Sequence, residues 1–376
     1  MVKANRTKNS LRFLVDENGN EHTLNREKGN IASDYFENLF MSSYPANSQL
    51  ALDGFKARVS EKMNQELTQA VTELEIHSAV FSIIAESAPC PDGFTALFFQ
   101  KNWNVVKDQI ISEILGFFET GVLPQEWNHT HLCLIPKITN LERMSDIRPI
   151  GLCSVLYKII SKILSFRLKK HLPAIISPTQ SAFVAERLFS DNILIAHEIV
   201  HSLRTNDMIS KEFMAFKTDM SKAYDRVEWS FLQEILVALG FNGKWISWIM
   251  GCVTSVTYSV LINGQPFGHI TPERGIRQGD PISPFLFVLC TEALIHILQQ
   301  AEISKKVSGI QFNGFGPSVN HLLFADDTLL VCRATESDCE QIMLCLSQYG
   351  HISGQLINVE KSSITFGVKV DEDTKQ

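Results

Sequence analysis

The stretch HLLFADDTLLV, residues 321–331, places two adjacent aspartates between two short apolar runs. Alternating apolar residues on both sides favour β-strands, and the Ala-Asp-Asp step favours a tight turn between them. Another aspartate, Asp219, directly follows a strand pattern at residues 213–218. If these strands are neighbours in one sheet, Asp219, Asp326 and Asp327 converge at its edge.

Three neighbouring carboxylates repel one another unless a cation neutralises them. Mg²⁺ prefers a few carboxylate ligands together with the phosphate oxygens of a substrate. Two such ions about 3.5–4 Å apart stabilise both the attacking and the leaving oxygen of a phosphoryl transfer. The sequence therefore predicts a two-metal phosphoryl-transfer site. The alternative is that Asp-Asp is an ordinary hairpin turn and Asp219 only ends a strand, and turn chemistry alone favours this alternative.

The rest of the chain mixes helices with hairpins. Periodic apolar residues predict helices at 31–40, 68–84, 103–118, 155–172, 191–203 and 227–239, and another that opens at Ser283. Asn263-Gly264 between two strand patterns predicts a hairpin. Asp225 and Glu228 have the spacing of a capping box before the 227–239 helix. This mixture indicates the α+β class, and 45% hydrophobic content is enough to bury a core.

The charge is unevenly distributed along the chain. The 376 residues carry a net charge of −7, which is unusual for a protein that binds nucleic acid. Residues 131–190, however, hold 9 Lys and Arg against 3 Asp and Glu, a local net charge of +6 that can hold a phosphate backbone. Part of this stretch is equally well explained as a solvated helix face. That part consists of Lys158, Lys162, Lys169 and Lys170.

Other features predict an intracellular, soluble protein. The eight cysteines show no Cys-x-x-Cys pair and no zinc spacing, which favours a reducing compartment and no structural metal. Residues 1–20 lack the apolar core of a signal peptide. The longest apolar run, residues 282–298, contains Pro284, Glu292 and His296, and we expect it to be too short and too polar to cross a bilayer.

Three motifs, in order, resemble those of reverse transcriptases. Phe324-Ala325-Asp326-Asp327 resembles their Phe/Tyr-x-Asp-Asp box, and the stretch Asp219–Val227 resembles their first aspartate motif. Between them, the stretch Arg277–Pro284 resembles a third motif of the family. The resemblance extends from about Ala88 to Phe366 and is greatest to plant LINE-type (non-LTR) retrotransposons.

This resemblance implies a role for each matching residue. Asp219 and Asp326 would bind two Mg²⁺ ions, with Mn²⁺ as a substitute and Asp327 in support. The further metal and nucleotide contacts implied are the Met220 carbonyl on one metal, Tyr224 against the sugar, Gln278 and Gly279 along the incoming nucleotide, and Lys137 and Arg148 on the triphosphate. The resemblance also implies that Lys361 donates a proton to pyrophosphate and that Arg277 contacts the triphosphate. Three of the implied roles have alternatives. Tyr224 would pack in the core, Lys361 would be a surface charge, and Arg277 would pair with Asp280.

The resemblance also implies architecture and partners. It implies a right-hand polymerase with an N-terminal helical extension at 1–86, fingers at about 87–212, an antiparallel palm sheet at about 213–366 and a polar tail at 367–376. The implied partners are an RNA template, a DNA primer and deoxynucleoside triphosphates, in the nucleus and without a membrane. We expect the family's thumb and endonuclease to lie outside this chain, in a longer element protein.

Three positions depart from the family. Cys90 replaces a glycine in a turn, where a positive φ would strain it. Ala185-Glu186 stands where Pro-Gly is usual, which would disturb a turn and disfavour template phosphates, and Gln355-Leu356 replaces Leu-Lys. With the missing thumb, these departures support an alternative, a catalytically inactive truncated relic that at most binds nucleic acid. Another Mg²⁺-dependent phosphohydrolase built on the same carboxylates is the third hypothesis.

Overall fold

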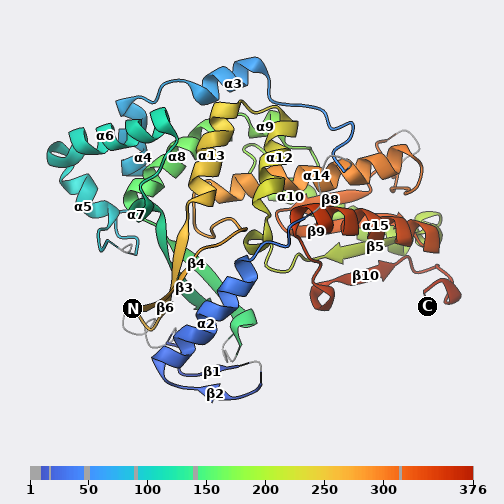
Figure 1. The fold of residues 1–376 in the computed structure, drawn as a ribbon. Coiled ribbons are helices and arrows are strands. Elements are labelled where there is room, and N and C mark those ends of the chain that lie inside the picture. Colours follow the sequence, from blue (N-terminus) through green and yellow to red (C-terminus); the bar gives the residue numbers. More distant parts are fainter. Residues whose placement is uncertain are drawn as a thin grey trace. The chain divides into compact units, whose positions relative to one another are not determined.

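The computed structural model describes residues 10–16, 18–45, 51–88, 92–138, 143–312 and 316–375 (Figure 1). The chain forms two compact units, each assembled from three separate stretches. Unit 1 comprises Met1–Ser42, Gln65–Arg167 and Asn242–Ser283, and unit 2 comprises Ser43–Asn64, Leu168–Phe241 and Pro284–Gln376. Both units combine helices with antiparallel strand pairs, which confirms the α+β class.

Unit 1 is built on a four-stranded sheet of order β4-β3-β6-β7, in which only the β3–β6 pair is parallel. Its strands are β3 His129–Pro136, β4 Ile147–Leu152, β6 Thr257–Ile262 and β7 Gln265–Ile270. The hairpin predicted at Asn263-Gly264 is confirmed. Both residues have positive φ (51° and 88°), as the two-residue turn that matches strand twist requires. A separate two-stranded ribbon consists of β1 Leu14–Val15 and β2 Glu21–His22.

Unit 1 also contains helices. They are α2 Asn25–Phe40, α4 Glu73–Ser82, α5 Ala96–Lys101, α6 Trp103–Thr120, α7 Gln125–Asn128 and α13 Gly243–Thr254; α3 Glu61–Thr68 and α8 Val155–Lys169 continue in sequence from one unit into the other. Helix α2 contacts β6 and β7 closely, since a Cβ on Gly29 would lie 2.4 Å from the Phe267 ring. Bulky side chains at position 29 are therefore excluded.

Two helix predictions need correction. The helix expected at 68–84 is the shorter α4, because Thr72 starts it with a capping box in which Thr72 and Glu75 satisfy each other's N–H groups, and Thr68 is instead the last residue of α3. The box predicted at Asp225 and Glu228 is wrong. Residues Tyr224–Arg226 form a short 3-10 helix, Asp225 is buried, and the N–H of Glu228 donates to the Ser353 carbonyl.

Unit 2 is built on a fully antiparallel sheet of order β10-β5-β9-β8 (Figure 1). Its strands are β5 Phe213–Thr218, β8 His321–Phe324, β9 Asp327–Arg333 and β10 Ser363–Phe366. The helices of this unit are α9 Leu172–Ile175, α10 Phe189–Thr205, α11 Ile209–Glu212, α12 Trp229–Leu239, α14 Ser283–Ile303 and α15 Glu336–Ser353. Ile199 and Leu203 of α10 join Ala215, Leu322 and Val331 of the sheet in one apolar cluster. This packing holds the strands of the sheet in fixed positions against α10.

Helix α14 is longer than the apolar run identified in the sequence. Its 21 residues pass the length and hydropathy test for a membrane span, so the expectation that the run is too short and too polar is wrong. However, 78% of its most apolar 18-residue window is buried inside the fold. The core helix of a globular protein has the same properties, so length and hydropathy do not indicate a span here.

Candidate active site

The three aspartates lie where two antiparallel strand pairs end in unit 2. Thr218, the last residue of β5, pairs with Thr328 of β9, and continuing this register places Asp219 beside Asp327. Phe324 of β8 pairs with Asp327, which leaves Ala325 and Asp326 as a two-residue turn. Backbone geometry therefore brings Asp219, Asp326 and Asp327 to one end of the sheet, as the sequence predicted.

Two of these carboxylates have lysine partners. Lys361 Nζ lies 3.7 Å from Asp219 Oδ2, and Lys217 Nζ lies 3.4 Å from Asp327 Oδ1. Both lysines are more than half exposed, and such pairs contribute only about 0–1 kcal/mol to stability. Among the residues that the structure describes, no three Asp, Glu, His or Cys side chains form a cluster that could hold an ion. The carboxylate oxygens of the three aspartates are the type of ligand that Mg²⁺ prefers, and a divalent cation would displace the weakly paired lysines.

Tyr224 and Met220 lie in the loop that follows Asp219. The Tyr224 ring stacks on Phe287, with centroids 4.9 Å apart and planes 9° apart. Burial, and then the negative charge of Asp326, raises the pKa of Tyr224 well above its usual range. Met220 is buried and forms an isolated bridge with Ile357. Tyr224 is thus half-buried and packs on the core residue Phe287, which supports the packing explanation, and its contact with the sugar stays a prediction.

The other nucleotide contacts implied by the sequence, Lys137, Arg148, Gln278 and Gly279, belong to unit 1. Lys137 directly follows β3, and its N–H donates to the Asp146 carbonyl (2.8 Å) just before β4. Arg148 is an exposed residue of β4, opposite Ile135 of β3. Lys137 and Arg148 therefore share one end of the β3–β4 pair.

Gln278 and Gly279 lie against the same strand β4. The Gln278 carbonyl accepts from the N–H of Gly151 (2.8 Å). Gly279 has a φ of 97°, and a Cβ there would lie 3.3 Å from Ile150. Conformation and space both require glycine at this position.

Arg277, next to this pair, is buried. Its guanidinium carbon lies 3.8 Å from the centroid of the Tyr157 ring, and its nitrogens donate to Thr130 Oγ1 (2.9 Å) and the Cys252 carbonyl (3.2 Å). Its Nε is 3.9 Å from Asp280 Oδ2. The pairing with Asp280 is the alternative that the sequence left open for Arg277.

Comparison with known proteins identifies the family. Residues 135–374, more than half of the chain, match the family described as reverse transcriptase (RNA-dependent DNA polymerase). The chain belongs to the reverse transcriptase family.

Related proteins include several from transposable elements. An uncharacterized 149 kDa protein of transposon TX1 from Xenopus laevis is 30% identical over 344 residues, 90% of this chain and 26% of that protein. The retrovirus-related Pol polyprotein from the type-2 retrotransposable element R2DM of Drosophila melanogaster is 27% identical over 81% of this chain and 27% of its own length. An uncharacterized mitochondrial protein of Arabidopsis thaliana is 53% identical over 68 residues, 18% of this chain and 56% of that protein. The chain thus spans about a quarter of the length of the first and second of these relatives.

In this reverse transcriptase, a segment whose backbone contacts were not predicted holds the aspartate loop. The Ser221 N–H donates to the Leu356 carbonyl (2.7 Å), and the Asn358 N–H donates to the Asp219 carbonyl (2.8 Å). The buried Gln355 donates from Nε2 to the Ala223 carbonyl (2.8 Å). Gln355, a departure from the family in sequence, therefore fixes the residue before Tyr224.

Two charges of the basic stretch make contacts within the protein. Arg167 is 3% exposed and donates to Glu75 and to the Leu67 and Gln69 carbonyls. The partly buried Arg187 donates to four backbone carbonyls of α9 and the loop after it. The positive field available to a phosphate backbone is therefore smaller than the sequence count suggests.

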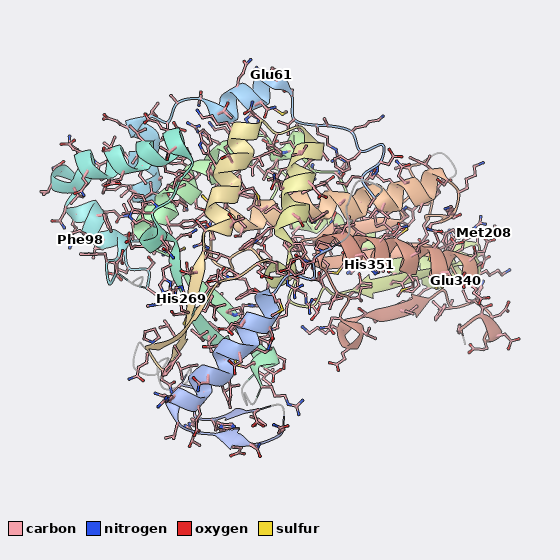
Figure 2. All side chains as sticks on the ribbon, in the orientation of Figure 1. Glu61, Phe98, Met208, His269, Glu340 and His351 are labelled. Atoms are coloured by element: carbon pink, nitrogen blue, oxygen red, sulfur yellow. The ribbon has the colours of Figure 1, made fainter. Side chains whose placement is uncertain are left out.

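The turn that contains Glu186 forms despite its side chain. Glu186 has a φ of 67°, the left-handed region that favours glycine, whereas Cys90 lies outside the described residues. We expect Glu186→Gly to raise the free energy of unfolding by about 0.5–1 kcal/mol, because relief of the strain exceeds the added entropy of the unfolded chain. Thermal unfolding measures this. As a control, Glu340→Gly on the exposed face of α15 (Figure 2) should lower stability by about 1 kcal/mol, and equal effects of the two changes would contradict the argument.

Acid should destabilise the strand that leads to the hairpin. Burial lowers the pKa of His321 in β8 from 6.5 to about 4, and its Nε2 lies 2.9 Å from Thr179 Oγ1. Between these values the unfolded chain binds a proton that the native chain does not, so stability falls as pH drops from 6.5 to 4, by about 3 kcal/mol in total. Denaturant unfolding at several pH values should show a flatter dependence for His321→Gln. Identical pH slopes in the two proteins would refute this.

Proposed function

We propose that this chain is the RNA-directed DNA polymerase core of a LINE-type (non-LTR) retrotransposon protein. The register that sets Asp219 beside Asp327, with Asp326 in the adjoining turn, is the observation that carries the proposal. A plant source is supported by the 53% identity to the Arabidopsis protein, and a role in the nucleus is a prediction of the family resemblance.

In the proposed reaction, Asp219 and Asp326 would hold two Mg²⁺ ions, with support from Asp327 and the Met220 carbonyl. When bound, Mg²⁺ would supply positive charge at the phosphate oxygens and at the primer 3′-hydroxyl, which attacks the α-phosphate as pyrophosphate leaves. Tyr224 would close the space beside the sugar 2′ position. Lys137 and Arg148 would bind the triphosphate, Arg as a planar fork and Lys as a point charge. Lys361 would protonate the leaving pyrophosphate, a role supported by the 3.7 Å between its Nζ and Asp219 Oδ2.

We further propose fingers at about 87–212 and a palm at about 213–366, with a thumb and an endonuclease in a longer protein. The small share of the relatives that the chain covers supports the longer protein.

Primer extension on an RNA template, with deoxynucleotides and Mg²⁺, tests the proposal. DNA synthesis that requires template and metal supports it. Salt-dependent RNA binding without extension would instead favour an inactive relic, and template-free hydrolysis of phosphomonoesters would favour a phosphohydrolase.

A further inference from the structure

The loop between α9 and α10 lies along the edge of β8, next to the aspartate hairpin. Leu323 N–H donates to the Thr179 carbonyl (2.8 Å), and Ser181 N–H donates to the Leu323 carbonyl (3.2 Å). Gln180 and Leu323 form a parallel bridge. The loop therefore extends the sheet just before the turn that carries Asp326.

The side chain of Gln180 reaches this turn. Gln180 is fully buried, and its Oε1 accepts from the N–H of Ala325 (3.1 Å) and from that of Ala182 (3.0 Å). Its Nε2 lies 3.3 Å from Thr291 Oγ1. Ala325, the residue immediately before Asp326, has a φ of 54°, a conformation that a residue with a Cβ rarely adopts.

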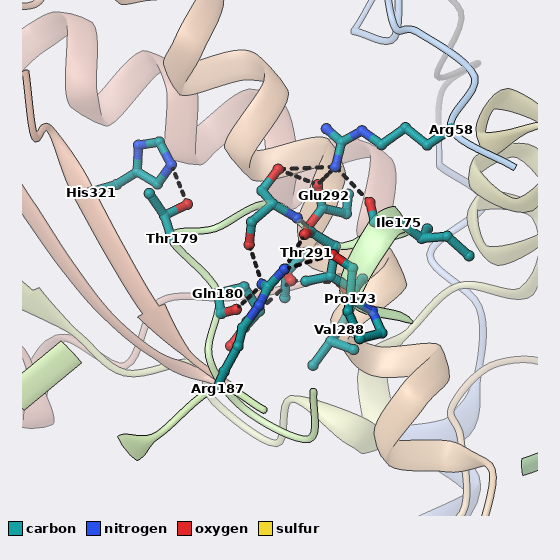
Figure 3. Close-up of polar contacts among 12 residues, drawn as sticks. Arg58, Pro173, Ile175, Thr179, Gln180, Arg187, Val288, Thr291, Glu292 and His321 are labelled. Carbon is teal, nitrogen blue, oxygen red and sulfur yellow. Dashed lines mark hydrogen bonds and ion pairs between the residues drawn. The ribbon is translucent and has the colours of Figure 1, made fainter. Parts of the chain in front are cut away.

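The loop that presents Gln180 is itself fixed by the buried Glu292 and by the partly buried Arg58 and Arg187 (Figure 3). Arg187 donates to the carbonyls of Ser177 and Gln180, both at 2.6 Å. Glu292, with no exposed surface, accepts from the Ser177 N–H (2.8 Å) and from Arg58 (2.5 Å). Gln180 is therefore held on a rigid support, as a group that orients another residue must be.

We propose that Gln180 is a positioning residue of the polymerase site: its Oε1 holds Ala325 in the left-handed conformation and so sets the direction of Asp326. A buried N–H without an acceptor and a strained φ both disfavour this turn once the amide oxygen is removed. The catalytic consequence rests on the proposed function, whereas the conformational claim does not.

The test compares Gln180→Met, Ala325→Gly, their combination, and Thr291→Val as a control that removes the Nε2 contact and the bond from Thr291 to the Val288 carbonyl but leaves the Oε1 bonds in place. Steady-state primer extension and hydrogen exchange at the Ala325 amide are measured for each. We expect Gln180→Met to lower kcat by about 10²-fold with little change in the KM for deoxynucleotide, and to speed exchange at Ala325. Ala325→Gly should restore most of kcat in the Gln180→Met background, because glycine adopts the turn without help. Thr291→Val should leave kcat and exchange near wild type.

Failure of Ala325→Gly to rescue, or an equal loss of kcat in Thr291→Val, would overturn the proposal. If the wild type shows no extension, the proposed function fails, and amide exchange still decides: faster exchange in Gln180→Met than in Thr291→Val supports positioning, and equal exchange refutes it. Should Gln180→Met not fold, Gln180→Asn, which shortens the side chain by one methylene, is subject to the same comparison and the same outcomes.

Discussion

The double change Asp326→Asn, Asp327→Asn is expected to reduce primer extension by about 10³-fold or more at saturating Mg²⁺. Asparagine keeps the size of the side chain and its ability to accept hydrogen bonds, but it removes the charge that holds a divalent cation. Loss of several kcal/mol of transition-state stabilisation corresponds to this factor, since each 1.36 kcal/mol is about tenfold in rate. Initial rates on an RNA template with a labelled primer provide the measurement.

Folding and charge must be separated from chemistry in this experiment. Asp371→Asn, Asp373→Asn removes the same two charges from exposed positions of the same unit, and its rate should match that of the wild type. Loss of Asp327 also frees Lys217, but the pair is more than half exposed, so the unfolding temperature should change little. A double variant that keeps a tenth of the wild-type rate, or a control that loses as much, would exclude the aspartates as the metal ligands.

The aspartates were accessible from sequence because each lies at the end of a short apolar strand. Strand, turn and strand are local patterns, and the sequence 321–331 contains both halves of its own hairpin. The Asn263-Gly264 turn was predictable for the same reason, since the conformation it requires is encoded by the two residues themselves.

What sequence could not supply was contact between distant segments. Gln180 and Ala325 are 145 residues apart, and Gln355 and Ala223 are 132 residues apart. No local pattern marks a buried amide that supports a strand end elsewhere. The failed capping box illustrates the same limit: Asp225 has the right spacing, but tertiary packing buries it in a short 3-10 helix.

Replacing Arg277 with Met should lower the free energy of unfolding by about 3–5 kcal/mol, the usual cost of leaving a buried charge without its partner. Both side chains of the Arg277–Asp280 pair are only 3% exposed. Asp280 would keep hydrogen bonds from Tyr157 (2.5 Å) and Ser161, but it would lose its only paired positive charge among the described residues. Denaturant unfolding of the variant gives the magnitude.

Two companion variants decide whether Arg277 acts through structure or through the nucleotide. Adding Asp280→Asn removes the uncompensated charge, so the double variant should be more stable than Arg277→Met alone. Arg148→Met, an exposed arginine of β4 in the same unit, should leave stability within about 0.5 kcal/mol of wild type and instead raise the KM for deoxynucleotide. If Arg277→Met raises that KM while the free energy of unfolding stays at the wild-type value, Arg277 acts by contacting the triphosphate and not through its buried pair with Asp280.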